Sequence, residues 1–250
     1  MCESSEVIDL RRYADPGRVV EECALQILQW LGQAMDLNAN GMATLAISGG
    51  SSPKAMFELF AGMPFSWQRV HLFWVDERGV PPGDSQSNFK LANDVWLGKS
   101  EFPAVNIHRV HAELPPLQAA EGYVKDIRAF FGLGQSQLPA FDVIHRGLGP
   151  DAHTASLFPG DPAIEDHREI AAAVWVEKFA QWRITLLPGV LEKARHTAML
   201  VVGADKAVAF QDVVNASYEP MRLPGQIATR DGSPAVWFVD AAAAGPKQPR

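Results

Sequence analysis

The stretch ATLAISGGSSPKAMFELF, residues 43–60, decides the fold class of this chain. Residues 43–48 form an almost unbroken apolar run of strand length, which is typical of a strand buried on both faces. The run ends in a glycine–serine loop, residues 49–52, and Pro53 then favours the first turn of a helix that we expect to extend to about Phe60. A buried strand, a glycine loop and a helix in this order predict the start of a parallel crossover unit.

The same alternation continues in both directions along the chain. Upstream, Asp15 and Pro16 predict the cap and first turn of an amphipathic helix with apolar positions from Val19 to Leu31. Downstream, Ser87 predicts the cap of a helix over 88–97. Further strands are expected at 70–75, 105–110, 141–145, 184–187, 197–202 and 236–239, and further helices at 117–131 and 205–214. This order predicts an α/β fold, a doubly wound and mostly parallel sheet with helices on both faces.

Length and composition favour a single domain. A chain of 250 residues with 47% apolar content can bury a large core, and it contains no repeat, low-complexity tract or interdomain linker. We therefore expect one α/β domain over residues 1–245 and a frayed tail over 246–250.

Charge and cysteine content exclude several classes of partner. The formal net charge is -7 with acidic residues spread along the chain, whereas nucleic acid and anionic membranes need clustered lysine and arginine. Only Cys2 and Cys23 are present, too few for a disulfide framework. No apolar signal region begins the chain, and no stretch approaches the roughly 20 apolar residues of a membrane span. We expect a small-molecule ligand, no nucleic acid, no membrane and a cytoplasmic location; nothing in the sequence indicates the oligomeric state.

The glycine–serine loop after the first predicted strand is a candidate phosphate site. Glycines allow backbone N–H groups to approach an anion, Ser51 and Ser52 add hydroxyl donors, and the following helix directs its positive end toward the loop. The loop lacks the lysine of a P-loop. A plain strand-to-helix turn with a serine cap fits it equally well.

The segment WVDERG, residues 74–79, places two carboxylates and a guanidinium directly after a second apolar strand. The fork of Arg78 suits a phosphate or a developing oxyanion, because it donates several hydrogen bonds in one plane. Taken alone, the segment is better interpreted as a solvated loop with an internal ion pair.

The segment RGLGPDAHTASLFPG, residues 146–160, concentrates functional groups at the end of another strand. Histidine is the side chain best suited to general-base catalysis near neutral pH, so His153 can act as a base toward water, and Asp151 can orient its ring. The alternative gives His153 a helix-start position with Thr154 as the cap. Ligands of open α/β sheets bind outside the carboxyl ends of the strands, and this position favours catalysis.

Six motifs together resemble the motif series of the 6-phosphogluconolactonases. They are SGGSSP, VDERGVPPGDSQSNF, GLGPDAHTASLFPG, RITLLP, VVGADKA and VWFVDAAAA, in this order, and they extend over nearly the whole chain. The resemblance implies the fold of the glucosamine-6-phosphate deaminases and hydrolysis of 6-phospho-D-glucono-1,5-lactone in the oxidative pentose phosphate pathway. It implies no cofactor and no metal.

The resemblance also implies roles for individual residues. His153 becomes the base that activates water, Asp151 its supporting carboxylate, and Arg78 a substrate-binding cation of the catalytic group. The residues implied for the substrate phosphate are Gly49, Gly50, Ser51 and Ser52, with Arg183 and Lys206 supplying positive charge. Without the resemblance, Lys206 would be a surface lysine at a helix start and Arg183 a residue at a strand edge.

Two positions depart from the family pattern. The family commonly has glycine where this chain has Ala152, so either this position needs no positive φ or the loop carries strain. It has aliphatic residues where this chain has His145 and Arg146, which end a strand that we expect to be buried; they reach either a polar partner or the mouth of the site.

The proposed chemistry needs few parts. A δ-lactone is an activated ester, which requires an oriented water, a base and stabilisation of the carbonyl oxygen. No G-x-S-x-G elbow is present, and Ser156 lacks an evident partner set for an acyl-enzyme route. The seven histidines are scattered, and His108 and His111 lack the further ligands of a catalytic zinc site.

Two other functions remain open from the sequence. An aminosugar-phosphate deaminase on the same fold would use Asp76 to abstract a carbon-bound proton. The deaminase pattern has an acidic residue five positions beyond the histidine of the glycine-rich turn, where this chain has Phe158. A non-catalytic sugar-phosphate sensor would keep the binding loops without turnover.

Overall fold

A seven-stranded parallel sheet forms the middle of the computed structural model, which describes residues 8–230 and 235–245. In spatial order its strands are β1 (Asp9–Tyr13), β10 (Ala235–Asp240), β9 (His196–Val201), β6 (Val143–Gly147), β2 (Ala43–Ile47), β3 (Val70–Trp74) and β5 (Ile107–His108). Each pair of neighbouring strands runs parallel. The predicted doubly wound α/β fold is therefore confirmed.

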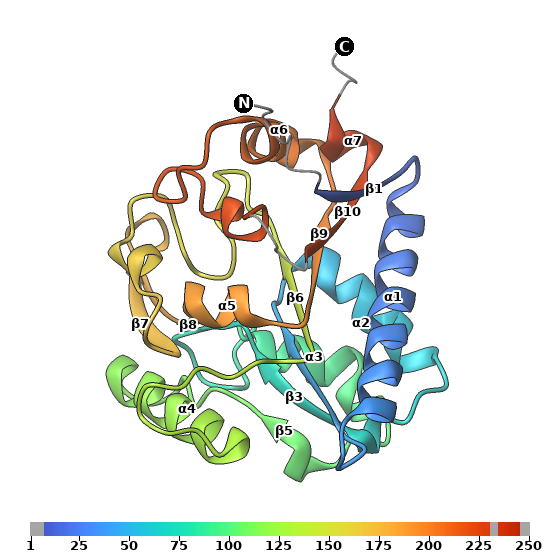
Figure 1. The fold of residues 1–250 in the computed structure, drawn as a ribbon, viewed down its shortest axis with the longest axis vertical. Helices are drawn as coiled ribbons and strands as arrows, with labels where there is room; N and C mark the ends of the chain where they lie inside the picture. Colours follow the sequence, from blue (N-terminus) through green and yellow to red (C-terminus); the bar gives the residue numbers. More distant parts are fainter. Residues whose placement is uncertain (1–7, 231–234, 246–250) are drawn as a thin grey trace, which may run out of the picture.

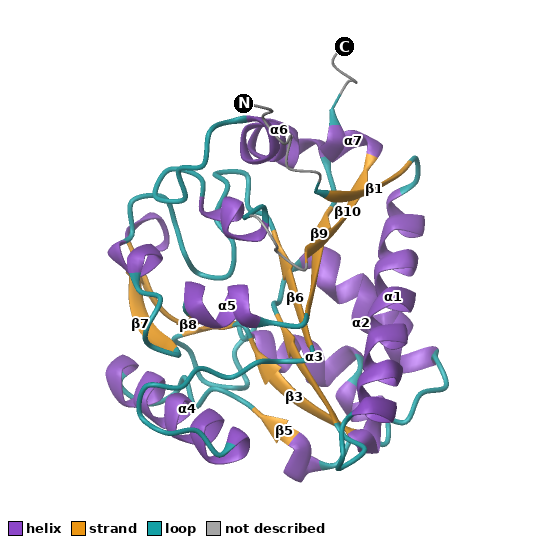
Figure 2. Ribbon diagram, in the orientation of Figure 1, coloured by secondary structure: helices purple, strands orange, loops and turns teal. Residues whose placement is uncertain are grey.

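Helices cover both faces of this sheet (Figure 2). One face carries α1 (Pro16–Leu37), α2 (Ser51–Gly62) and α3 (Asn88–Val95), and the other carries α4 (Pro116–Phe131) and α5 (Pro188–Lys193). The remaining helices, α6 (Ala207–Asn215) and α7 (Ala241–Ala244), lie beyond β9 and β10 (Figure 1). No helix in the described part of the chain is both long enough and apolar enough to cross a membrane.

A second, three-stranded antiparallel sheet stands beside the first. It consists of β4 (Asp76–Arg78), β8 (Gln181–Leu186) and β7 (Ala171–Val176), with β8 in the middle. One residue separates β4 from β3, so the chain passes directly from the parallel sheet into the small one. This arrangement brings the β7–β8 hairpin next to the carboxyl ends of the parallel strands.

The predicted helix starts are confirmed by their caps. The Asp15 carboxylate accepts a hydrogen bond from the N–H of Arg18 at 2.9 Å, and the Ser87 hydroxyl accepts one from the N–H of Lys90 at 3.1 Å. Both bonds satisfy donors that a helix start leaves without an internal partner. Cys23 lies on the buried face of α1 as a free thiol.

Several element bounds differ from the prediction. The strand expected at 105–110 is reduced to β5, and the helix expected at 205–214 begins as a 3₁₀ turn at Ala204–Lys206 before α6. Strands β1, β4 and β7 were not predicted, nor were the short helices α5 and α7. Their sequences explain this, because DLRRY, DER and AAAVWV lack the apolar alternation of an ordinary strand. The predicted tail, 246–250, lies outside the described residues.

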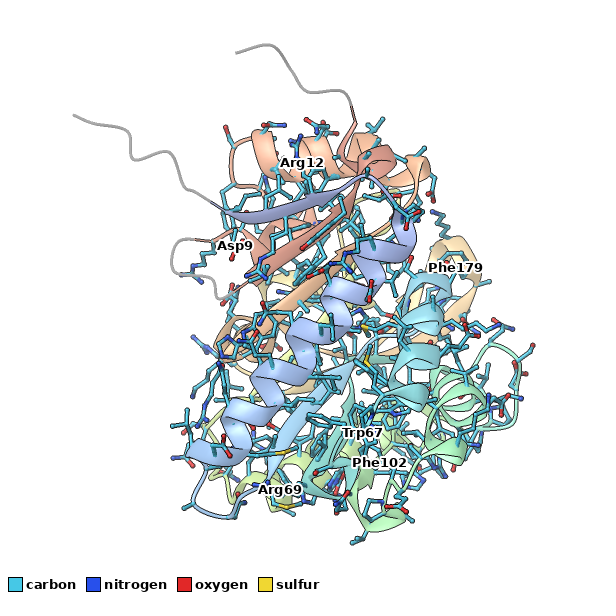
Figure 3. All side chains as sticks on the ribbon, turned by 90° about the vertical axis from the view of Figure 1, so that its right-hand side faces the viewer. Asp9, Arg12, Trp67, Arg69, Phe102 and Phe179 are labelled. Carbon is cyan, nitrogen blue, oxygen red and sulfur yellow. The ribbon has the colours of Figure 1, made fainter. Side chains whose placement is uncertain are left out.

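Aromatic residues fill the core between α2, α3 and the sheet. Trp67 packs edge-on against Trp96 at 4.7 Å between ring centroids and stacks with Phe102 at 5.9 Å. Figure 3 looks onto the face covered by α1 and shows Trp67 and Phe102 close together at one end of it. This packing holds α2 and α3 against the parallel sheet.

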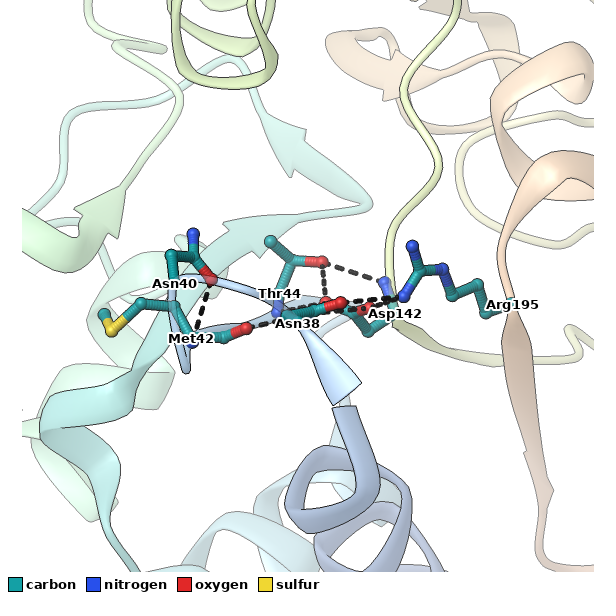
Figure 4. Close-up of polar contacts among 6 residues, drawn as sticks. All are labelled: Asn38, Asn40, Met42, Thr44, Asp142 and Arg195. Carbon is teal, nitrogen blue, oxygen red and sulfur yellow. Dashed lines mark hydrogen bonds and ion pairs between the residues drawn. The ribbon is translucent and has the colours of Figure 1, made fainter. Parts of the chain in front are cut away.

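A polar cluster closes the opposite edge of the sheet, at the amino ends of the strands (Figure 4). Asp142, which precedes β6, is only 4% exposed and accepts hydrogen bonds from the N–H and hydroxyl of Thr44, both at 2.8 Å. Its carboxylate also accepts from Arg195 at 2.9 Å and from Asn38 at 3.3 Å. These four residues, which we call the Asp142 cluster, join the end of α1 to the starts of β2, β6 and β9.

Candidate active site

The carboxyl ends of β2, β6 and β9 open onto one cavity of about 230 Å³. The glycine–serine loop after β2 forms one wall, and the loop 147–150 after β6 forms another. The predicted residues that line the cavity are Gly49, Gly50, Ser51, Ser52, Arg78, His153, Arg183 and Lys206. Asp151 is bonded to His153 behind this lining. The structure thus brings together every site residue that the sequence predicted.

His153 and Asp151 form a hydrogen-bonded pair. The Nδ1 atom of His153 lies 2.5 Å from Oδ1 of Asp151, and the second carboxylate oxygen accepts a hydrogen bond from Nζ of Lys178 at 2.9 Å. Hydrogen bonds from His153 and Lys178 hold the pKa of Asp151 well below its usual range. A carboxylate on Nδ1 fixes the proton there and leaves Nε2 as the nitrogen that can accept a proton.

Two glycines allow the close packing of this site. A Cβ atom at Gly149 would lie 1.9 Å from Nδ1 of His153, and one at Gly49 would lie 1.9 Å from Oδ1 of Asn88. No side chain other than hydrogen fits at either position. Glycine is therefore needed at these positions so that the backbone can approach the His153 and Asn88 side chains closely, and not only for backbone flexibility.

The turn between Asp151 and His153 carries backbone strain. Ala152 has φ +64°, in the left-handed region that favours glycine, and Ala155 has φ +54°. The carbonyl of Ala152 accepts a hydrogen bond from Gly225 at 2.8 Å, and its N–H donates to Gly149 at 3.0 Å. These bonds hold Ala152 in a conformation that costs about 1 to 2 kcal/mol. Of the two alternatives left open by the sequence, the strained loop is the one observed.

Two arginines face the cavity from the small antiparallel sheet. Arg78 of β4 lies opposite Arg183 of β8 in the antiparallel register, and both side chains line the cavity. Burial lowers the pKa of Arg183; the charge of Asp76 opposes this change, and the charge of Arg78 adds to it. The Nε atoms of both guanidiniums are buried and have no hydrogen-bond partner. Two like charges with unused donors at one cavity are suited to an anion.

Lys206 adds a third cation, from the 3₁₀ turn before α6. Its ammonium group lies 2.7 Å from the Asp205 carboxylate, which is 64% exposed. The lysine is therefore partly neutralised by a neighbour, whereas no carboxylate is paired with Arg78 or Arg183 among the described ion pairs.

The two acidic residues after β3 have different environments, and the interpretation of a solvated loop with an internal ion pair is wrong. Glu77 is 2% exposed, and its carboxylate accepts hydrogen bonds from the N–H groups of Asn88 and Phe89 at 2.7 and 2.8 Å. Burial raises the pKa of Glu77 although these bonds oppose the change. Glu77 thus fixes the start of α3, while Asp76 lines the cavity and accepts from the hydroxyl of Ser156 at 2.8 Å.

His145 and Arg146 lie inside the protein, and neither lines the cavity. Burial lowers the pKa of His145 to about 3, and neither of its ring nitrogens has a hydrogen-bond partner. Burial lowers the pKa of Arg146 to about 10, and the charges of Glu192 and Tyr218 partly offset this. The two side chains occupy opposite faces of β6, as successive strand residues do. The expected place at the mouth of the site is therefore wrong for both residues, and the expected polar partner is also wrong for His145.

Sequence reasoning missed three residues of the site. Asp76 was assigned only to the alternative deaminase, although it lines the cavity. Phe158 stacks on the ring of His153 with 4.2 Å between centroids, and Lys178 bonds Asp151. Phe158 lies five positions after His153, so its place in the turn was a usable signal. Lys178 lies 27 residues from Asp151 and carried none.

Fold and site together place the chain among the α/β enzymes that bind a small anionic substrate at the carboxyl edge of a parallel sheet. Residues 14–237 match the family model described as glucosamine-6-phosphate isomerases/6-phosphogluconolactonase. The chain belongs to this family.

Individual relatives agree with the family match. A 6-phosphogluconolactonase of Synechocystis is 34% identical over 80% of this chain and 82% of its own length. A solved structure titled devB protein is 30% identical, with a TM-score of 0.84 over 95% of this chain and 98% of that chain. The solved 6-phosphogluconolactonase of Thermotoga maritima is 25% identical, with a TM-score of 0.80 over 94% of this chain and all of that chain.

Proposed function

We propose that this chain hydrolyses 6-phospho-D-glucono-1,5-lactone to 6-phospho-D-gluconate, the second step of the oxidative branch of the pentose phosphate pathway. The observation that carries the proposal is the His153–Asp151 pair at the wall of a cavity that also holds Arg78 and Arg183. A base beside unpaired cations suits an anionic ester that is opened by water. The family membership of the chain and the names of its relatives support the same substrate.

In the proposed mechanism His153 is the general base. Its Nε2 takes a proton from a water molecule while the water oxygen attacks C1 of the lactone. The carbonyl oxygen becomes negative, and the bond between C1 and the ring oxygen then breaks. The imidazolium returns its proton to the departing ring oxygen, so one water is consumed and one carboxylic acid is formed. Asp151 stabilises the imidazolium and keeps the ring in the required tautomer.

The remaining residues hold the substrate. The backbone N–H groups of the glycine–serine loop and the start of α2 attract the 6-phosphate, because a helix amino end carries partial positive charge. Lys206 and Arg183 add full charges to the same cavity. Arg78 is the cation of the catalytic group, and its Nη1 is held by the carbonyl of Gln86 at 2.6 Å.

The alternative functions receive less support. A deaminase would have an acidic residue at the position of Phe158, and here an aromatic ring stacks on His153 instead. Asp76 is placed in the cavity, as a deaminase would also require, so the distinction depends on Phe158. A binding protein without turnover has no need for a carboxylate at 2.5 Å from Nδ1 of His153.

A single assay tests the proposal. The rate of lactone opening is measured near neutral pH with and without the protein, because such lactones also open unaided. We expect a rate well above background and no ammonia from glucosamine 6-phosphate. Ammonia release without lactone hydrolysis would establish the deaminase instead, and no product from either substrate would favour the binding protein.

We also propose that the reaction needs no metal. No group of three or more His, Cys, Asp or Glu side chains within residues 8–230 and 235–245 is arranged to hold one. Activity should therefore survive EDTA unchanged. Complete loss with EDTA and recovery with a divalent ion would contradict the metal-free mechanism.

The cytoplasmic location also stays a prediction, which cell fractionation would test.

A further inference from the structure

The tip of the β7–β8 hairpin is in direct contact with the catalytic pair. Residues Glu177–Phe179 form a single 3₁₀ turn between the two strands, and Ala180 completes it with φ +46°. From this tip the ammonium of Lys178 reaches the carboxylate of Asp151 at 2.9 Å. The hairpin is separate in sequence from the loop that carries the pair, so this bond joins two independent segments.

The two oxygens of Asp151 have different partners. Oδ1 is bonded to His153, while Oδ2 is bonded to Lys178. The Asp151 side chain is 29% exposed, so without a second partner water would compete for the free oxygen and the carboxylate could rotate. Lys178 thereby fixes the plane of the carboxylate that orients the imidazole.

The tip also supports the imidazole itself. The ring of Phe179 packs edge-on against Phe158 at 5.9 Å, and Phe158 stacks on His153. The Lys178 ammonium and the Arg183 guanidinium each lie over the Phe179 ring, at 5.6 and 5.3 Å from its centroid. The four-residue turn therefore contacts Asp151 directly and His153 only through Phe158.

The charge of Lys178 has a chemical consequence. A carboxylate next to an imidazole favours the protonated ring, and a base that stays protonated cannot accept a proton from water. A lysine on the far oxygen opposes this effect, because its positive charge disfavours a second positive charge on the imidazole. Other charged groups that face the pair from the cavity are Asp76 and Arg78 of β4, Arg183 of β8 and Lys206, and the variants below leave them unchanged.

We propose that Lys178 is a positioning residue of the active site, which acts through Asp151 to hold the carboxylate in place and to keep His153 free to act as a base near neutral pH. The inference rests on the proposed function for its effect on turnover. No family motif identified in the sequence includes Lys178, and the assignment rests on its contact with Asp151.

The test compares Lys178→Met, which keeps the length of the side chain without its charge, with Lys178→Arg, which keeps the charge. Lys90→Met is the control, because Lys90 forms a comparable surface ion pair with Asp94 on α3, away from the cavity. In Lys178→Met we expect kcat to fall about 5- to 20-fold. We also expect the acid limb of the kcat/KM profile to move up by about half a pH unit, a smaller shift than the loss of a buried charge would cause. Lys178→Arg and Lys90→Met should keep the limb in its wild-type position.

A second measurement does not depend on turnover. The imidazole signal of His153 is followed by NMR during a pH titration of the resting proteins and is assigned by its absence from His153→Gln. We expect the midpoint to move upward in Lys178→Met and to return in Lys178→Arg. An unchanged midpoint in folded Lys178→Met, or an equal shift in Lys178→Arg, would overturn the inference. A wild type that does not open the lactone would defeat the proposed function, while this titration would still decide on Lys178.

Discussion

Two carboxylates flank β6, and they are built for different purposes. Asp142 precedes the strand and its side chain is 6% exposed, whereas Asp151 follows the strand and its side chain is 29% exposed. The donors to Asp142 include a backbone N–H, a hydroxyl and an amide, besides Arg195. Both side-chain partners of Asp151, His153 and Lys178, are ionisable.

The difference separates stability from activity along a single strand. At the amino ends of the strands, the donors to Asp142 do not change their protonation near neutral pH. They stabilise this edge of the sheet, because a buried carboxylate is costly unless it is fully hydrogen-bonded. Ionisable partners at the carboxyl edge leave the charge distribution free to change during a reaction. Substitutions at the two edges should therefore affect different measurements.

The largest effect is expected at the carboxyl edge, from His153→Ala. Loss of a positioned base should lower kcat by about 10²- to 10⁴-fold with a smaller change in KM, because the phosphate contacts lie elsewhere. Unfolding in urea should be nearly unchanged. Asp151→Asn should lower kcat as well, and the double variant should lose much less than the product of the single losses. A folded His153→Ala protein with near-wild-type kcat would remove His153 from the mechanism.

The opposite result is expected at the amino edge, from Asp142→Ala. The change leaves donors of Thr44, Asn38 and Arg195 without their acceptor, and it should reduce the free energy of unfolding by roughly 3 kcal/mol. Activity of the folded fraction should stay within about twofold, an expectation based on the distance of this edge from the cavity. Denaturant titration and kinetics on the same preparation measure both. If Asp142→Ala lost activity but kept its stability, the assignment of stability to this edge of the sheet would be wrong.

The next effect concerns substrate binding within the cavity. Lys206→Ala and Arg78→Ala should each reduce kcat/KM for the phosphorylated lactone by about 2 kcal/mol, or roughly 30-fold. An unphosphorylated gluconolactone should be affected less wherever the lost contact is to phosphate. Equal losses on both substrates would assign that residue to the reacting ring. An unaffected variant would place its residue outside the site.

A smaller effect should appear in acid. The pKa of Asp151 is lowered in the folded protein, so its stabilising contribution is complete above the unfolded value near 4 and is lost as the pH falls through the lower folded value. Asp151→Asn should therefore cost about 1 kcal/mol or less at pH 7, since the side chain is partly exposed, and the cost should shrink below pH 4. Calorimetry of both proteins between pH 3 and 7 measures the difference; a cost that grows in acid would have the wrong sign.

The smallest effect is expected from Ala152→Gly. Glycine relieves the strain at φ +64° but increases the entropy of the unfolded chain and removes a buried methyl group. These contributions nearly cancel, and stability should change by less than about 1 kcal/mol. Ala152→Val, which tolerates a positive φ poorly, should cost clearly more. Equal stability of the two variants would mean that the turn relaxes without strain.

Sequence reasoning predicted most of the parallel sheet and the proximity of Asp151 to His153, for a local reason. Strands β2, β6 and β9 are each followed by a glycine-containing turn, and Asp151 and His153 lie in the turn after β6. Strand β7 was missed because three of its six residues are alanines, which have weak strand preference and pair only because β8 is present.

The misinterpreted residues depend on contacts between distant segments. Glu77 resembled one half of an ion pair with its neighbour Arg78, whereas its carboxylate in fact binds the start of α3, eleven and twelve residues later. Lys178 was not singled out in the sequence, because only the antiparallel pairing of β7 with β8 brings it to Asp151. No local pattern in the sequence indicates either contact.

The Asp142 cluster also has a consequence for biosynthesis. Its members lie far apart in the chain: Thr44 and Asp142 are separated by 98 residues, and Asp142 and Arg195 by 53. At a translation rate of about 5 to 20 residues per second, Asp142 is synthesised roughly 3 to 10 seconds before Arg195. Before Arg195 is added, the nascent chain already carries Asp151 and His153, while its sheet still lacks β9. Asp151 and His153 are therefore synthesised before the ion pair between Asp142 and Arg195 can form.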